Sequence, residues 1–245
     1  MKYTYKKARF YYAMYLMKER AHLLTNTTFE KNRIRRIISD YNDATFGIDI
    51  SHYQDFMVFD SLSLMHGSIP IEFVVMRATM GKDGIDRKFN RYWQQLENQD
   101  FIRGAYHYYR PWESPELQAK LFLDQIELKK GDLRPVLDIE KIAKNQSKES
   151  LVADLQIWLN LVEEEYQTKP IIYTYYHFYK ENLENQFDDY PLWIANYNDV
   201  AEPITDVDWQ FWQFTENGIL PGVPHKVDIN IFNGGRWQLL KYTLD

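Results

Sequence analysis

The chain contains no cysteine among its 245 residues, so disulfide bonds and cysteine-ligated metal sites are excluded. Its histidines show no His-x-x-x-His or similar spacing that would indicate a metal site. Neither a glycine-rich phosphate-binding loop nor the nucleophile motif of Ser-His-Asp hydrolases is present. The apolar run at residues 10–17 is too short to span a bilayer. The sequence therefore predicts neither a metal ion nor a cofactor.

Charge is distributed unevenly along the chain. Residues 1–45 carry ten Lys and Arg against four Asp and Glu, whereas residues 46–245 carry 19 against 31. The acidic balance of the larger part argues against nucleic acid as a partner. A hydrophobic content of 45% and a charged content of 26% are typical of a soluble globular protein. Aromatic residues make up 16%, and their flat apolar faces and polar edges would suit a sugar-binding cleft.

The basic segment at residues 1–45 is predicted to be an N-terminal extension, with a helical form favoured, ahead of a main domain at residues 46–245. We expect the extension to pack on the main domain or on a partner. Contact of its basic residues with a membrane surface is one alternative, and a degenerate targeting segment is another. A monomer is expected.

Eight apolar runs in the main domain are predicted to be β-strands that alternate with helix-like stretches. The runs lie at residues 46–50, 72–78, 104–109, 135–139, 170–174, 192–195, 209–214 and 227–229. Ser114 and Pro115 predict the start of one helix, and an apolar stripe predicts another at residues 148–167. This alternation implies the α/β class and an irregular (β/α)8-like barrel, in which the chemistry lies at the carboxyl ends of the strands.

Two carboxylates end the fourth run, which reads Arg-Pro-Val-Leu-Asp-Ile-Glu at residues 134–140. Alternate residues of a strand face the same side, so Asp138 and Glu140 lie about 6.5–7 Å apart along it and repel each other. Buried acids are unfavourable unless they are paired or hydrogen-bonded, so this pair is a candidate for acid–base chemistry at a cleaved bond. The pattern also arises by chance in two solvated surface acids, so other segments must converge on it.

Polar and aromatic residues also end other predicted strands. In chain order these ends read Gly-Ile-Asp49-Ile-Ser, Gly-Ala-Tyr106-His107, Ile-Tyr173-Thr, Leu-Trp193-Ile-Ala-Asn196-Tyr197, Trp212-Gln213 and Val-Asp228-Ile-Asn230. Together with Val-Leu-Asp-x-Glu they resemble, over about residues 46–240, the glycoside hydrolase family 25 muramidases, which are the Chalaropsis-type lysozymes. The second strand departs from the family pattern, because it carries Arg77 and Met80 where the family usually has Lys and Glu.

The resemblance implies hydrolysis of the β-1,4 bond between N-acetylmuramic acid and N-acetylglucosamine in the glycan strands of peptidoglycan. It implies that Glu140 is the general acid, that Asp138 is an electrostatic or acetamido-orienting partner, and that Asp49 and Asp228 are further cleft acids. The residues expected to bind substrate are Tyr106, Tyr173, Trp193, Asn196, Trp212 and Gln213. Since this substrate lies outside the cytoplasm, a location in the bacterial cell envelope or secretion is expected, although the N-terminus does not show the export route.

Two other functions stay open at this point. One is a catalytically silent glycan-binding protein, against which four mutually repelling acids argue, and the other is a chitinase-like hydrolase of N-acetylglucosamine polymers. The spacing of the acid pair does not decide between retention and inversion of the anomer; we expect retention assisted by the substrate's 2-acetamido group. His107 is expected to be a hydrogen-bonded core residue.

Overall fold

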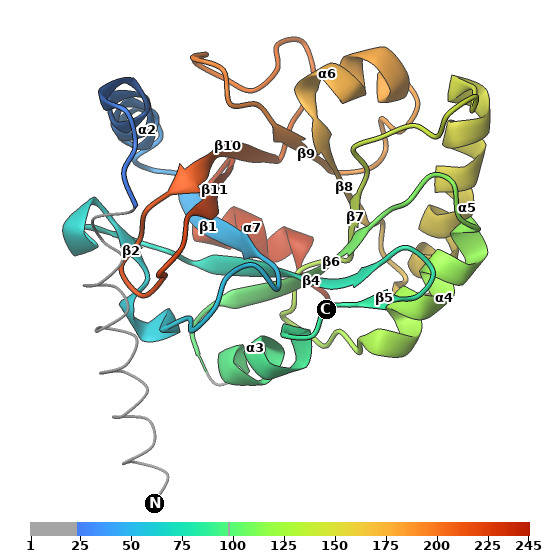
Figure 1. The fold of residues 1–245 in the computed structure, drawn as a ribbon, viewed down its shortest axis with the longest axis horizontal. Coiled ribbons are helices and arrows are strands. Elements are labelled where there is room, and N and C mark those ends of the chain that lie inside the picture. Colours follow the sequence, from blue (N-terminus) through green and yellow to red (C-terminus); the bar gives the residue numbers. More distant parts are fainter. Residues whose placement is uncertain (1–23, 98) are drawn as a thin grey trace, which may run out of the picture.

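Eight strands close into a barrel in the computed structural model, which describes residues 24–97 and 99–245 (Figure 1). In order around the barrel they are β1 (Thr45–Ile50), β11 (Val227–Phe232), β10 (Phe211–Gly218), β9 (Leu192–Ala195), β8 (Ile171–Tyr175), β7 (Val136–Asp138), β6 (Ile102–Tyr108) and β4 (Phe73–Met80), which pairs again with β1. Each predicted strand overlaps one of these. All neighbours pair in parallel except β11, which runs antiparallel to β1 and β10. The prediction of an irregular α/β barrel is therefore confirmed.

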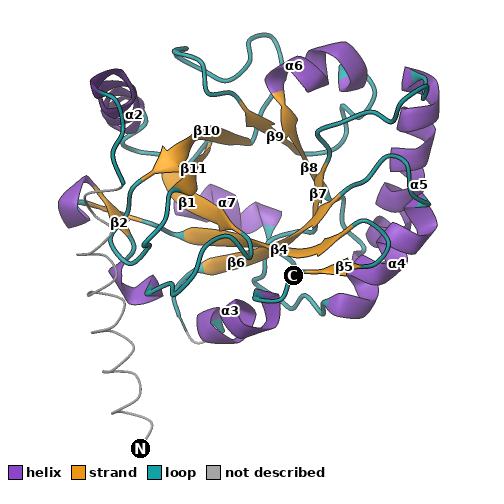
Figure 2. Cartoon of the chain, viewed as in Figure 1, coloured by secondary structure: helices purple, strands orange, loops and turns teal. Residues whose placement is uncertain are grey.

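Three helices follow strands in the regular βα manner and cover the outside of the barrel (Figure 2). They are α3 (Phe89–Leu96), α4 (Pro115–Gln125) and α5 (Lys148–Tyr166). The predicted start of α4 is confirmed, because the Ser114 side chain accepts a hydrogen bond from the Leu117 amide at 3.2 Å, with Pro115 at the first helical position.

The other connections are irregular, which accounts for the departure from an ideal (β/α)8 barrel. Their elements are β2 (Ser63–Leu64), β3 (Ile69–Pro70), β5 (Gly84–Ile85), α6 (Tyr176–Phe178), α7 (Arg236–Leu239), the 3₁₀ helices Phe59–Ser61, Met65–Gly67 and Leu240–Tyr242, and the π-helix Tyr179–Leu183. A loop at residues 219–226, without a crossover helix, joins β10 to β11, and the last strand therefore runs antiparallel to β10.

Helix α2 (Thr28–Asp40) precedes the barrel and packs against it. The Thr27 side chain caps its start by accepting from the Glu30 amide at 3.1 Å. Arg33 is buried and donates to the Phe214 carbonyl on β10 at 2.7 Å, and Ile37 and Ile38 join the core. Residues 1–23, on which the expectations of membrane contact or a targeting segment largely rest, lie outside the described residues, and the domain boundary at residue 45 stays a prediction. Within the described ranges, no helix is long and apolar enough to cross a membrane.

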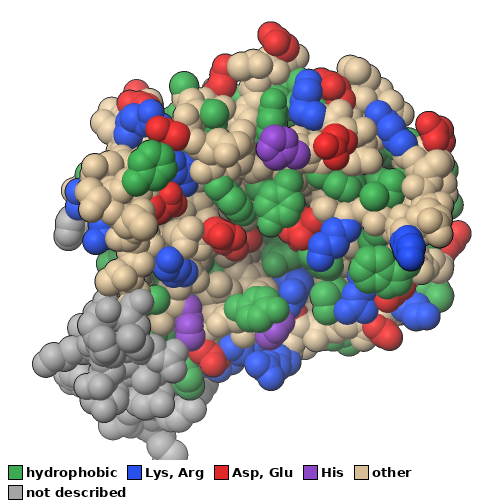
Figure 3. Space-filling model, turned by 45° about the horizontal axis from the view of Figure 1, so that its top comes forward, with side chains coloured by type: hydrophobic (Ala, Val, Ile, Leu, Met, Phe, Trp, Pro, Cys, Tyr) green, Lys and Arg blue, Asp and Glu red, His purple; other side chains and the backbone are tan. Residues whose placement is uncertain are grey.

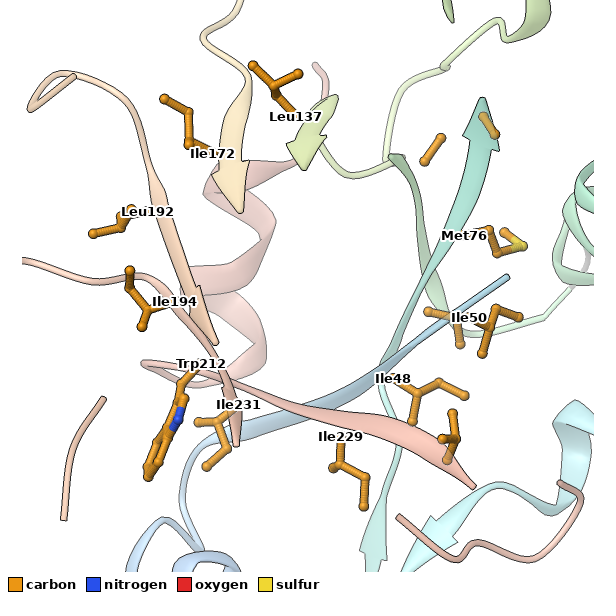
Figure 4. Packing of buried hydrophobic residues seen from close by; sticks show 14 of the residues in the cluster. Ile48, Ile50, Met76, Leu137, Ile172, Leu192, Ile194, Trp212, Ile229 and Ile231 are labelled. Atoms are coloured by element: carbon orange, nitrogen blue, oxygen red, sulfur yellow. The ribbon is translucent and has the colours of Figure 1, made fainter. Parts of the chain in front are cut away.

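Side chains alternate between the two sides of the barrel wall, as strand geometry requires. The outward set is apolar and packs beneath the helices. Figure 4 labels ten of these side chains: Ile48, Ile50, Met76, Leu137, Ile172, Leu192, Ile194, Trp212, Ile229 and Ile231. Burial of this layer removes a large apolar area from water and supplies the main driving force for folding.

The inward set forms a second apolar cluster that fills one half of the barrel and includes Phe73, Phe211, Phe232 and Leu239 of α7. The rings of Phe73 and Phe211 meet edge to face, with centroids 5.8 Å apart. Gly47 permits this packing, since a Cβ at that position would lie 2.3 Å from the Phe73 ring. Toward the carboxyl ends of the parallel strands, the inward side chains become polar.

Candidate active site

A cavity of about 220 Å³ opens where the parallel strands end. In Figure 3, acidic and large hydrophobic side chains gather at the hollowed centre of the face shown. The lining residues come from the whole barrel wall and the adjoining loops: Asp49, Ser51, Tyr53, Arg77, Tyr106, Tyr108, Val136, Asp138, Glu140, Tyr173, Tyr175, Trp193, Tyr197, Gln213, Glu216 and Asp228.

The four acids predicted from the sequence all line this cavity, and we call them the cavity acids: Asp49, Asp138, Glu140 and Asp228. Asp49 lies near the end of β1 and Asp228 near the start of β11. The antiparallel pairing sets these two residues opposite each other, so the end of β1 and the start of β11 meet at the mouth of the cavity. Asp138 ends β7 and Glu140 follows two residues later on the same side.

Asp49 is buried and accepts hydrogen bonds from two side-chain amides. Its Oδ2 accepts from Gln213 Nε2 at 2.7 Å and from Asn230 Nδ2 at 2.8 Å. Asn230 is fixed in turn by Trp193 Nε1, which donates to its Oδ1 at 3.0 Å. Burial raises the pKa of Asp49, but these amide donors oppose the rise by stabilising the charged form.

Asp228 shares a hydrogen bond with Asp49. Burial raises the pKa of Asp228 well above its usual range, and the neighbouring Asp49 charge raises it further. Since two carboxylates share a hydrogen bond only when one is protonated, the amide donors favour a charged Asp49 and a protonated Asp228.

Asp138 and Glu140 form the second coupled pair. Asp138 is buried, and its Oδ1 has no hydrogen-bond partner among the residues described. Burial is the main cause that raises the pKa of Asp138 well above its usual range, and the charges of Glu140 and Asp49 raise it further. Burial also raises the pKa of Glu140, while hydrogen bonds with Tyr108 and Tyr175 and the charge of Lys141 oppose the rise. The pair therefore holds a proton at a pH where free carboxyls are ionised.

Four of the six side chains predicted to bind substrate line the cavity: Tyr106, Tyr173, Trp193 and Gln213. The other two do not. Trp212 is fully buried on the outer side of β10, where its ring meets Tyr41 of the α2 region at 5.7 Å. Asn196 is buried and donates to the Pro203 carbonyl at 2.9 Å, which fixes the loop between β9 and β10.

His107 is confirmed as a core residue. Its ring nitrogens contact Thr79 Oγ1 at 2.7 Å and Gln118 Oε1 at 3.2 Å, and the ring stacks on Trp158 at 5.7 Å. Burial lowers the pKa of His107 to about 4.

Several lining residues were missed by the sequence reasoning, above all the tyrosines at positions 108, 175 and 197. A signal for them was present, because each lies two residues from an inward-facing Tyr106, Tyr173 or Ala195 and so shares its side. Glu216, on the last part of β10, adds a fifth acid to the lining. Over the described ranges, no group of three or more His, Cys, Asp or Glu could hold a metal ion. The arrangement can bind a polar ligand between tyrosines and transfer protons through carboxyls.

Comparison with known proteins points to one family. The family model described as glycosyl hydrolases family 25 matches residues 48–223. The uncharacterized protein YegX of Escherichia coli (strain K12) is 37% identical over 189 residues, which cover 77% of this chain and 69% of YegX. Lysozyme M1 of Streptomyces globisporus is 29% identical over 208 residues, which cover 79% of this chain and 69% of that protein. The bacterial lysozyme structure from Streptomyces coelicolor is similar with a TM-score of 0.71 and 26% identity, covering 82% of this chain and 97% of that one.

Proposed function

This chain belongs to glycosyl hydrolases family 25 and is a glycoside hydrolase of the lysozyme type, and we propose that it cleaves the β-1,4 bond between N-acetylmuramic acid and N-acetylglucosamine with Glu140 as general acid. Its substrate class is peptidoglycan, which lies outside the cytoplasm, so the protein is proposed to act in the cell envelope or after secretion. The observation that carries the proposal is the convergence of the four cavity acids on one cavity lined by tyrosines.

Glu140 suits the role of proton donor because its environment works in two directions. Burial raises its pKa, and the coupled pair of Glu140 and Asp138 holds a proton that the proposed mechanism places on Glu140 when the bond is cleaved. The hydrogen bonds of Tyr108 and Tyr175 stabilise the carboxylate that remains after the proton has passed to the leaving oxygen. The two tyrosines also fix the direction of the carboxyl group.

Asp138 suits the role of acetamido-orienting partner. Its Oδ1 is a buried acceptor that finds no partner within the described part of the chain, and such a group gains free energy when a substrate donor reaches it. The N–H of a 2-acetamido group is a donor of this kind. The carbonyl oxygen of a held acetamido group attacks the anomeric carbon as the bond to the leaving oxygen breaks and that oxygen takes the proton of Glu140, while Asp138 stabilises the positive charge that develops. Water, giving its proton to Glu140, then displaces the acetamido oxygen from the anomeric carbon, and the product anomer is retained.

The test is the clearing of a purified cell-wall suspension by the wild-type chain and by Glu140→Gln. Loss of the general acid is expected to reduce the rate by about 10²–10⁴-fold, whereas Glu164→Gln, the same change at an exposed site on α5, should leave it unchanged. Proton NMR of the first sugars released reports the anomer. Inverted product would refute the acetamido route.

Two outcomes would replace the proposal. Binding of cell walls without clearing by the wild-type chain would indicate a silent glycan-binding protein. Release of oligomers from chitin but not from peptidoglycan would indicate a chitinase-like hydrolase.

A further inference from the structure

Arg77 is the one Lys or Arg among the described residues that line the cavity, where it faces a lining that contains five acids. An anionic substrate group would be repelled over most of this surface. A neutral sugar polymer would need no cation here. The position of Arg77 therefore bears on which glycan the cavity accepts.

The guanidinium group is held from behind by two residues. Asp86, whose side chain is 1% exposed, accepts from Arg77 Nε at 3.2 Å and lies 3.1 Å from Nη2. Nη2 also contacts His52 Nδ1. Burial and the Arg77 charge lower the pKa of His52, which favours the neutral ring that can accept this hydrogen bond.

Asp86 is itself fixed, because it accepts from the His52 amide at 2.8 Å and from the Lys88 amide at 2.9 Å. The ring of exposed Tyr53 lies 5.9 Å from the guanidinium carbon. The cation is thus preorganised before any ligand arrives, and little side-chain entropy is lost on binding.

This arrangement leaves one edge of the guanidinium toward the cavity. Nε and Nη2 are engaged by Asp86 and His52, whereas Nη1 makes no hydrogen bond or ion pair with residues 24–97 and 99–245. Arg77 lies on β4 next to Tyr106 of β6, and β6 pairs with β7, which carries Asp138. Two strand spacings put the backbones of β4 and β7 about 10 Å apart, so Arg77 could reach a substituent of a sugar bound at Asp138.

We propose that Arg77 binds a carboxylate carried by a muramic acid unit beside the cleaved bond and thereby makes the cavity selective for carboxylate-bearing glycan strands over neutral N-acetylglucosamine polymers. This inference rests on the proposed function. The carboxylate has two possible sources: the lactyl group of a muramic acid that has lost its stem peptide, and an acidic residue of the stem peptide. In an intact strand the lactyl carboxyl is in amide linkage and carries no charge, so the two sources can be separated experimentally.

The experiment compares three soluble substrates: glycan strands without stem peptides, the same strands with their carboxyl groups reduced to alcohols, and strands that keep the stem peptides. Steady-state kinetics are measured for the wild-type chain, Arg77→Gln, Arg77→Lys and the control Arg87→Gln, which removes an exposed arginine that does not line the cavity. Arg77→Gln is expected to reduce kcat/KM about 10- to 100-fold, mainly through KM, on a carboxylate-bearing substrate and to leave the reduced strands unaffected. Arg77→Lys keeps the charge but not the planar guanidinium group, so its kcat/KM should fall less than that of Arg77→Gln.

Each outcome bears on a separate point. A loss confined to stem-free strands assigns the lactyl carboxylate, and a loss confined to peptide-bearing strands assigns the stem peptide. An equal loss on reduced and unreduced strands would overturn the proposal, because Arg77 would then act only by holding Asp86 and His52 in place. Absence of cleavage by the wild-type chain would instead refute the proposed function. In that case calorimetry of the wild-type chain and Arg77→Gln with the stem-free and the reduced strands still tests Arg77. Weaker binding of only the unreduced strands by Arg77→Gln supports the proposal, and unchanged binding overturns it.

Discussion

Replacing Gln213 with Met tests the hydrogen-bond network that holds Asp49. Gln213 Nε2 donates to Asp49 at 2.7 Å, and its Oε1 accepts from the hydroxyls of Tyr173 at 2.8 Å and of Tyr197. A hydrogen bond to a charged group contributes about 1.5–3 kcal/mol and a neutral one about 1 kcal/mol. Met nearly conserves the volume, so no large cavity term is added. Both tyrosines line the cavity, where water can replace part of the hydrogen bonding that their hydroxyls lose, so the expected loss of unfolding free energy is about 3 kcal/mol.

The assay is denaturant unfolding at pH 7, with thermal unfolding as a second measurement. For a chain of this size the loss corresponds to a fall in Tm of roughly 6–12 °C. Gln94→Met, the same change at an exposed position on α3, serves as the control and should stay within about 0.5 kcal/mol of wild type. A Gln213→Met variant as stable as this control would contradict the prediction, because the network would then add nothing to the stability of the fold.

Two predictions concern pH. Burial raises the pKa of Asp138, so the folded state binds its proton more tightly than the unfolded state, and the unfolding free energy falls as pH rises above the ordinary carboxyl range. Asp138→Asn should remove that fall, be about 1–2 kcal/mol more stable than wild type at pH 7 and lose hydrolysis. A variant less stable than wild type would contradict this prediction. Burial lowers the pKa of His107 from 6.5 to about 4, so its contribution to the unfolding free energy is fully present above pH 6.5, and up to roughly 3 kcal/mol is lost as pH falls toward 4. His107→Asn should show a flatter dependence of unfolding free energy on pH over that window. An unchanged slope would exclude His107 as the source of this dependence.

Much of the barrel could be predicted because its strands follow simple periodic rules. The eight apolar runs and the start of α4 are local signals, and the acid pair at the end of β7 is visible in three residues. The direction of β11 is different, because it depends on how the chain turns after β10. The family resemblance predicted Asp228 as a cavity acid, but only the pairing with Asp49 explains why a residue near a strand start reaches the mouth of the cavity.

The placement of Asn196 and Trp212 illustrates a rule that was available in the sequence. Trp212 and Gln213 are adjacent on β10, so their side chains point to opposite sides of the wall and only one can face the cavity. Likewise Trp193 faces inward, so Tyr197 shares its side and Asn196 does not. A residue-by-residue count from one fixed inward position would have selected Tyr197 in place of Asn196 and would have kept Gln213 without Trp212.

The network around Asp49 could not be predicted, because it joins side chains from β1, β9, β10 and β11 that are far apart in sequence. Its effect is to distribute the donors unequally over the cavity acids. Asp49 receives two amide donors, whereas the Oδ1 atom of Asp138 receives none from the described residues. Desolvation without donors favours the protonated form, and desolvation with donors favours the ion.

This unequal distribution lets four crowded carboxyls coexist without four charges. Asp228 gives a hydrogen bond to the charged Asp49, so these two acids share one negative charge in a fixed geometry. The remaining pair, Asp138 and Glu140, is left with a proton and with an acceptor that a substrate amide could reach. An inert fold would relieve the burial of Asp138 by a donor or by an apolar residue. This unfavourable burial is retained where the proposed mechanism requires both a proton donor and a charge-stabilising group, so the more stable Asp138→Asn variant is expected to be inactive.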